Sequence, residues 1–425
     1  MLNRQGVRRF VLTGLCLAAL AAGLIWNGLF AVADLFSRRN QADSTRLAMR
    51  LAPANAAYSA QLAEELYASD PPAAKSLLQR AVKLNRFDAS SWIQLGLLSE
   101  SENDLPQAEE SLLQAARVDS TFLPSWSLTN FYFRRQNADR FWYWAQRAAQ
   151  MVPDDATPLL RLAWYVDPNA QEIEKRLQMR RPAVESQFVN FLIAQGNPEA
   201  VTTAAMHLLQ ATDKETTGTL LGACDWLLGQ KRPDLALGLW NGLATRTSYR
   251  SPGADSPVTN SDFGKSPLSH GFDWHLPTVE GVSTFLNANP NALGFEFSGE
   301  EPDRFLLLSQ TVPVHGQTNY ALTVDYGTSG IPPGSGLAWR VTEEQTGAVL
   351  AKTMSLSAEP GGRATSCFTT PKDAGFVNLS LLYQRQPGTV RIDGKLALKG
   401  VRLAVVAGDC PVEKISSSRA DSAVP

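Results

Sequence analysis

The stretch from Trp92 to Ala115, WIQLGLLSESENDLPQAEESLLQA, decides how half of this chain folds. Two residue classes that occur in it recur at intervals of 34 residues: aromatics at Tyr58, Trp92 and Trp126, and alanines at Ala81, Ala115 and Ala149. Two classes that recur together at one spacing of about 20 to 50 residues indicate stacked supersecondary units. Helical units of this kind seldom do chemistry and offer a concave face to a partner.

The motif within this stretch resembles the tetratricopeptide repeat. Trp92-x-x-Leu95-Gly96 lies on the expected first helix, and Ala108 and Ala115 lie on the second, where small side chains let the two helices approach closely. The resemblance implies three clear helical hairpins, at 55–88, 89–122 and 123–156. Their packing residues would be Tyr58, Ala74, Ala81, Trp92, Leu95, Gly96, Ala108, Ala115, Trp126 and Ala149.

Helical spacing of apolar residues extends the predicted solenoid over 40–246, with degenerate repeats in 157–246. Two segments there, Ala194–Ala200 and Gly229–Ala236, look like turns between paired helices. The resemblance also implies a concave groove for a protein partner. We expect Phe131, Arg134 and Arg135 to line it and to bind a carboxylate or an acidic segment. The alternative is a solvated helix end whose cations interact with the helix dipole.

Four consecutive aromatic residues, Phe141-Trp142-Tyr143-Trp144, form the most unusual run in the repeats. Side chains of adjacent helical residues point in different directions, so the four cannot all face one side. We expect most of the run to pack between repeats and Tyr143 or Trp144 to stay partly exposed. The exposed ring would suit a protein partner or the lipid interface.

The N-terminus predicts a membrane segment. A basic head, residues 1–9, precedes residues 10–33, and this segment of 24 residues carries no charge. A spanning helix needs about 20 residues. We therefore expect a signal anchor in the inner (cytoplasmic) membrane, with the body of the chain in the periplasm. A signal peptide cleaved after Ala33 is the main alternative. Lipid attachment at Cys16 is disfavoured, because the bulky Leu15 precedes it.

The C-terminal third changes to a period of two, after a Ser/Pro/Gly-rich linker at 247–259. It predicts an antiparallel β-sandwich over 260–410, followed by a disordered tail at 411–425. The fold class is therefore mixed: a membrane helix, an α-solenoid and a β-sandwich. The sandwich resembles jelly-roll domains of the carbohydrate-binding-module and galactose-binding-like type. The expected strands are Phe305–Val314, Tyr320–Tyr326, Leu337–Thr342, Val349–Met354, Ala364–Thr369, Phe376–Tyr383, Val390–Ile392 and Val401–Val406.

Sugar recognition needs flat aromatic faces together with carboxylates or amides. Trp274, Asp273 and Tyr326 have these residue types and are the candidates for a glycan platform, whereas Trp339 lies in an alternating strand and is expected in the core. Cys367 and Cys410 both fall in the β region. They can form one disulfide if this region lies outside the cytoplasm.

The chain carries no catalytic signature, nucleotide loop or cluster of metal-ligand spacing, so we expect no enzyme activity, cofactor or metal. Its net charge of -2 does not favour nucleic acid as a partner. The leading hypothesis is an envelope scaffold that binds a protein partner, in surface-polysaccharide biosynthesis or export or in secretion assembly. Carbohydrate recognition through the sandwich is the first alternative, and an envelope hydrolase is the second.

Overall fold

The computed structural model describes residues 4–211, 214–253, 256–357 and 362–408. In these residues fourteen α-helices precede nine strands, which confirms the mixed fold class. The predicted tail at 411–425 lies outside the described residues. The chain divides into two compact units, Met1–Val184 and Glu185–Pro425. This division falls within the predicted solenoid, so the last helices belong to the same unit as the sandwich.

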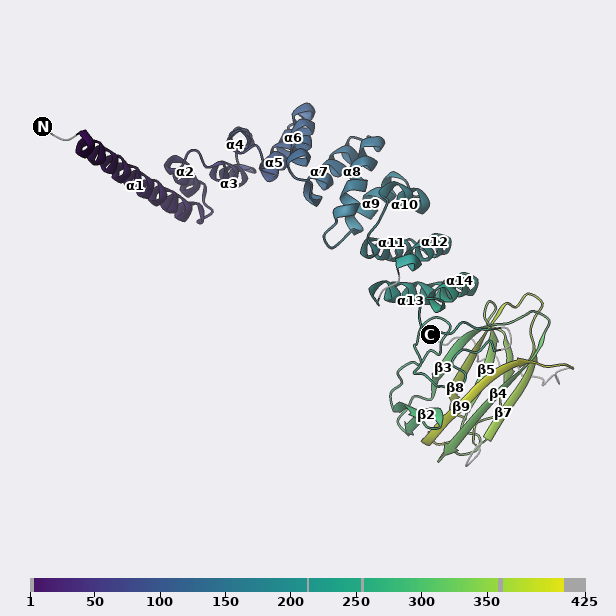
Figure 1. The fold of residues 1–425 in the computed structure, drawn as a ribbon. Helices are drawn as coiled ribbons and strands as arrows, with labels where there is room; N and C mark the ends of the chain where they lie inside the picture. Colours follow the sequence, from purple (N-terminus) through teal and green to yellow (C-terminus); the bar gives the residue numbers. More distant parts are fainter. Residues whose placement is uncertain (1–3, 212–213, 254–255, 358–361, 409–425) are drawn as a thin grey trace. The chain divides into compact units, whose positions relative to one another are not determined.

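The first unit begins with a long helix and continues as antiparallel hairpins (Figure 1). The predicted units at 55–88, 89–122 and 123–156 each contain one hairpin, and a fourth follows. The bounds are α1 Arg4–Ser37, α2 Ala42–Leu51, α3 Ala56–Leu66, α4 Pro71–Leu84, α5 Ala89–Ser101, α6 Leu105–Val118, α7 Phe122–Arg134, α8 Ala138–Met151, α9 Thr157–Val166 and α10 Ala170–Leu177.

Gly96 shows why this spacing of small residues matters. A Cβ atom at Gly96 would lie 2.7 Å from Cγ of Leu112 and 3.2 Å from the carbonyl oxygen of Ala108, so a larger residue fits only if the Leu112 side chain is displaced. The alanines predicted to pack, together with Tyr58 and Leu95, are buried. Trp92 and Trp126 are half-buried at the edge of their hairpins.

The turn inside a hairpin repeats one design. Asn103 and Gln136 take the left-handed conformation, with φ of 63° and 55°, and thereby end the first helix. The next residue, Asp104 or Asn137, caps the second helix by accepting a hydrogen bond from a backbone N–H. Local sequence therefore sets both the end of one helix and the start of the next.

The second unit contains the same turn at two further positions, Gly196 with φ of 76° and Lys231 with φ of 59°. Both lie in the segments that the sequence predicts as turns between paired helices. The helices that they join, with a short 3₁₀ turn at Leu209–Ala211, are α11 Pro182–Gln195, α12 Pro198–Leu208, α13 Lys214–Gly229 and α14 Pro233–Ala244. The degenerate repeats thus keep the hairpin without the 34-residue signature.

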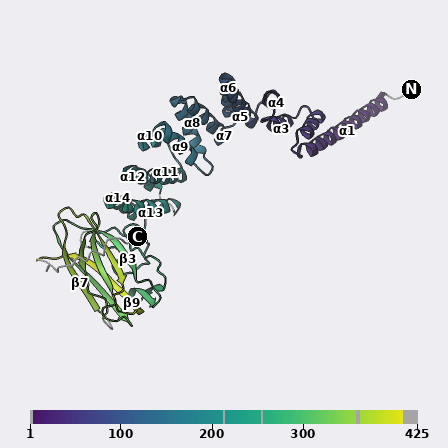
Figure 2. The same ribbon diagram turned by 180° about the vertical axis from the view of Figure 1, so that it is seen from behind.

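Nine strands in the described residues form two antiparallel sheets, seen from opposite sides in Figures 1 and 2. One sheet has the order β1-β2-β9-β4-β7 and the other the order β3-β8-β5-β6. The bounds are β1 Val282–Ala288, β2 Asn291–Ser298, β3 Arg304–Pro313, β4 Asn319–Ser329, β5 Leu337–Glu343, β6 Val349–Lys352, β7 Gly362–Thr369, β8 Phe376–Gln384 and β9 Asp393–Val405.

The inward side chains of both sheets form one apolar core that includes Trp274 and Trp339, whose rings meet edge to face at 5.8 Å. The sequence pattern did not predict β1 and β2. It also placed a strand at Val390–Ile392, which is wrong, because β9 begins only at Asp393. Short apolar runs of this kind carry no period by which a strand can be told from a loop.

The predicted linker at 247–259 is not a free hinge where the structure describes it. Val258 and Thr259 are buried, and the Thr259 hydroxyl donates to the carbonyl oxygen of Phe272. On the helical side, Nε1 of Trp240 in α14 donates to the carbonyl oxygen of Arg250 at 3.0 Å. The segment therefore ties α14 to the sandwich inside one compact unit.

Candidate functional site

A hollow with an aromatic lining lies in the first unit, where α7 ends, α8 begins and α9 ends. Its volume is about 600 Å³, within the range of about 300–1,000 Å³ that is usual for ligand pockets. We call it the aromatic groove. It is lined by Tyr132, Phe133, Arg134, Gln136, Asn137, Ala138, Phe141, Tyr165 and Val166.

Three aromatic rings shape the groove. Phe133 meets Tyr165 edge to face at 5.4 Å and lies 6.1 Å from Phe141. Phe141 is buried in its hairpin, whereas Tyr165 is 79% exposed. The buried ring of Phe141 and the exposed ring of Tyr165 together leave an apolar surface that a partner's side chain can cover.

The polar rim of the groove is held by an ion pair and a hydrogen bond within the chain. Arg134 donates from Nε and Nη2 to the two oxygens of Glu100, at 2.8 and 2.6 Å, and this hydrogen bonding raises the pKa of its guanidinium. Tyr132 donates to Glu109 at 2.7 Å, and burial together with that acceptor raises the pKa of its phenol to about 12. Both groups therefore keep their protons at neutral pH and hold successive hairpins together.

The three residues predicted for the groove have different positions. Arg134 lines the groove, but its charge is matched by Glu100. Arg135 is exposed at the C-terminal cap of α7 and is not among the lining residues. Phe131 is wrong as a contact residue, because its ring is buried against Tyr132. Phe133 and Tyr165 line the groove but were not predicted, because in the sequence each is only an aromatic residue near the end of a helix.

The run Phe141–Trp144 divides as its helical spacing requires. Phe141, Trp142 and Trp144 are buried, and Tyr143 is 54% exposed. Arg147 lies over the rings of both Tyr143 and Trp144, so the exposed part of the run is partly covered by a cation. Tyr143 is not one of the residues that line the aromatic groove.

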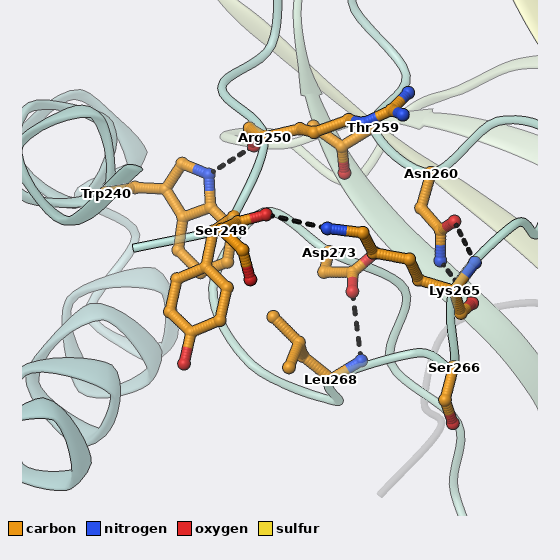
Figure 3. A pocket seen from close by; sticks show the side chains of 10 residues that line it. Trp240, Ser248, Arg250, Thr259, Asn260, Lys265, Ser266, Leu268 and Asp273 are labelled. Carbon is orange, nitrogen blue, oxygen red and sulfur yellow. Dashed lines mark hydrogen bonds between the residues drawn. The ribbon is translucent and has the colours of Figure 1, made fainter. Parts of the chain in front are cut away.

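A second hollow lies in the second unit, between α14 and the segment that enters the sandwich (Figure 3). Trp240 forms one wall, and Lys265, Leu268 and Asp273 form the other. Lys265 donates from Nζ to the carbonyl oxygen of Ser248 at 2.9 Å across it. Its volume is only about 90 Å³, well below the lower limit of about 300 Å³ for ligand pockets. We therefore interpret the hollow as a packing gap at the seam between α14 and the sandwich, and not as a ligand pocket.

The predicted glycan platform is wrong in all three of its residues. Trp274 is fully buried, and Asp273 and Tyr326 are each only 6% exposed. Asp273 accepts a hydrogen bond from the backbone N–H of Leu268, and burial raises the pKa of its carboxyl. Trp274 and Tyr326 belong to the apolar core of the sandwich, whereas the Asp273 carboxyl is buried beside the hollow at α14. Trp339 is buried in the core as expected.

The remaining polar residues near this seam also have structural partners. Nδ1 of His270 lies 2.5 Å from Oδ2 of Asp225 in α13, and the other oxygen of Asp225 accepts from the backbone N–H of Gly271 at 2.7 Å. Nε2 of His275 lies 3.0 Å from the carbonyl oxygen of Gly271. The two contacts of Asp225 fasten the loop at 270–271 to α13.

Cys367, on β7, is disulfide-bonded. Its predicted partner Cys410 lies outside the described residues. Among the described cysteines, Cys16 and Cys224 are free thiols.

No family model matches this chain, and no curated protein matches it. The helical part is similar to the crystal structure of MamA, with 20% identity and a TM-score of 0.26 over 31% of this chain and 81% of that one. It is also similar to YrrB, described as a TPR protein with an unusual peptide-binding site, with 12% identity and a TM-score of 0.25 over 49% and 94%. A structure described as CBM4 matches with 10% identity and a TM-score of 0.27 over 35% and 99%.

Proposed function

We propose that this chain is a non-catalytic, membrane-anchored scaffold of a bacterial-type envelope that holds a protein partner in the aromatic groove. The groove is the observation that carries the proposal. It is large enough for side chains of a partner, and its exposed Tyr165 is of the residue type that contributes most to binding energy at interfaces. Its one arginine is already paired, so apolar and aromatic contacts dominate recognition.

The anchor in this proposal is α1, which contains a candidate membrane span at Leu12–Ser37. Its C-terminal end is part of the folded body: Ala33 is fully buried in a cluster with Ala48, Ala52 and Tyr58. Cleavage after Ala33 would remove that packing. The burial of Ala33 therefore supports a retained anchor over a cleaved signal peptide.

The location in this proposal is the inner membrane, with the body on the periplasmic side. The disulfide at Cys367 supports this side, because disulfides persist in oxidising compartments. A role in surface-polysaccharide biosynthesis or export, or in secretion assembly, follows by analogy with proteins that combine an anchor with repeats. A polysaccharide partner and the sandwich as its docking module belong to the same proposal.

A photo-crosslinking amino acid at Tyr165, introduced in the native host, tests the groove. We expect a discrete crosslinked protein that is absent when the same residue is introduced at Leu123, which is 62% exposed on the same array. Once this partner is purified, Tyr165→Ala should weaken its binding at least fivefold, about 1 kcal/mol. Tyr143→Ala removes an equally polar, exposed tyrosine and should not. Equal effects of the two substitutions would refute the groove.

Carbohydrate recognition remains a second candidate, on a different surface from the one that the sequence predicts. On the outer face of the β1-β2-β9-β4-β7 sheet, the ring of Phe285 is 39% exposed and packs over the backbone of Gly294 on the neighbouring strand. The pair Lys395–Glu296 lies on the same face. An exposed ring beside polar groups suits a sugar. Binding of the full chain to a glycan array, lost on Phe285→Ala, would favour this function.

A further inference from the structure

We infer that α2 lies against the membrane surface and that Arg46 and Arg50 bind the phosphate groups of anionic lipids there. The inference rests on the proposed anchoring by α1. It adds the position at which the span ends and the side chains that contact the lipid beyond it. The evidence is the helix length, the packing of α1 against α2 and the exposed face of α2.

The uncharged and fully exposed part of α1 places the membrane boundary at Leu29. Every described side chain from Leu12 to Leu29 is exposed, and contact with the rest of the chain begins at Phe30. The uncharged segment starts at Phe10, and the twenty residues from Phe10 to Leu29 span about 30 Å at 1.5 Å per residue, which is the thickness of the hydrocarbon core. Trp26 is 59% exposed near this boundary, where membrane proteins gather tryptophan.

The packing of α2 brings its C-terminal end back to that boundary. Only residues 38–41 separate α1 from α2, so α2 runs back alongside the end of α1 (Figure 1). Ala48 and Ala52 are buried in one cluster with Ala33, and Phe30 packs against it. The end of α2 and the loop after it, which includes the exposed Ala54, therefore lie at the level where α1 leaves the hydrocarbon.

The exposed face of α2 has the chemistry of a lipid-contact surface. Its exposed residues Asp43, Arg46, Leu47 and Arg50 recur at helical spacing. Arg50, nearest the boundary, forms no ion pair with the residues that the structure describes, and Arg46 pairs only with Asp43, whose side chain is 96% exposed. Arg46 is four residues before Arg50 in α2 and therefore lies about 6 Å farther from the hydrocarbon core. This distance is within a headgroup layer roughly 5–7 Å deep.

Two other arginines at this hairpin provide a contrast. Arg38 pairs with Asp34 at 2.8 Å, and Arg39 lies over the ring of Phe36. Both lie past the end of α1, about 12 Å beyond Phe30 along the helix axis. They carry the same charge as Arg46 and Arg50 but lie too far from the boundary to bind phosphate. Arginine recognises phosphate in a forked geometry, and each cation near an anionic surface adds to the attraction.

The experiment uses the full chain with Cys16→Ser, reconstituted in vesicles of phosphatidylcholine with or without 30% phosphatidylglycerol. A fluorescent label on Ala54→Cys reports the depth of the hairpin through quenching by a headgroup nitroxide lipid. The matched control is a label on Ser120→Cys, in the exposed loop between α6 and α7. We expect at least threefold stronger quenching at position 54 than at 120. The phosphatidylglycerol vesicles should increase it further.

The double variant Arg46→Gln with Arg50→Gln should abolish the increase caused by phosphatidylglycerol, whereas Arg38→Gln with Arg39→Gln, which removes the same charge, should retain it. Equal quenching at positions 54 and 120 would overturn the inference, and so would equal effects of the two double variants. Retention of the protein in the vesicles after alkaline extraction is read separately. Its loss would refute the proposed anchor as well, whereas retention with an unquenched Ala54 label refutes the interfacial position alone.

Discussion

Aromatic residues differ in solvent exposure between the repeats and the sandwich. In the repeats, Tyr143 and Tyr165 stay exposed, and Tyr165 lines the aromatic groove. In the sandwich, Trp274 and Tyr326 are buried in the core. A repeat array is one hairpin thick, so each hairpin is covered only by its neighbours. Two packed sheets instead close over a common core and take up every inward ring. An aromatic residue is therefore better evidence of a binding surface in the first region than in the second.

The largest expected effect lies in the sandwich core. Trp339→Ala removes a fully buried ring that packs against Trp274, and the cavity should lower the free energy of unfolding of the second unit by about 3–5 kcal/mol. Tyr165→Ala, in the repeats, should change stability by no more than about 0.5 kcal/mol. Urea unfolding measures both. Similar losses for the two substitutions would remove the contrast between the two regions.

An intermediate effect is expected inside a hairpin. Gly96→Ala forces a Cβ atom against Leu112 and should destabilise the repeats by about 1–3 kcal/mol. Adding Leu112→Ala should make the cost of the glycine change smaller than it is in the native background, as a double-mutant cycle would show.

The control for Gly96 is Gly238→Ala in α14, where a Cβ atom would meet nothing within 4 Å. Only the higher helix propensity of alanine over glycine then matters, and the substitution should stabilise the helix by up to about 1 kcal/mol. Opposite signs at the two positions would support close helix approach as the reason for the glycine in the repeat. The same sign at both would contradict it.

A small effect is also expected at the rim of the groove. Arg134→Ala breaks the pair with Glu100, and because Arg134 is 42% exposed, we expect a loss of no more than about 1 kcal/mol. The loss should shrink in 1 M salt, which screens exposed charges. A larger loss that is independent of salt would mean that the pair is a core contact rather than a rim contact.

The helical hairpins could be predicted from the sequence, because the residues that define each hairpin are close together in the chain. The 34-residue spacing predicted the hairpins, and the predicted turns at Ala194–Ala200 and Gly229–Ala236 contain the left-handed residues Gly196 and Lys231. The uncharged segment before Asp34 likewise predicted the long N-terminal helix. Alternation predicted a sandwich, although it missed β1 and β2.

Which side chains face solvent depends on the packing of elements that are distant in the sequence. In the sandwich, strands that pair are distant in sequence, as with Leu293 and Leu398, and no local pattern shows that the Trp274 ring points inward. In the repeats, the aromatic groove forms where helix ends from two hairpins meet, so Phe133 and Tyr165 become neighbours only through packing. Residue type and spacing set the helices, whereas burial depends on what each element packs against.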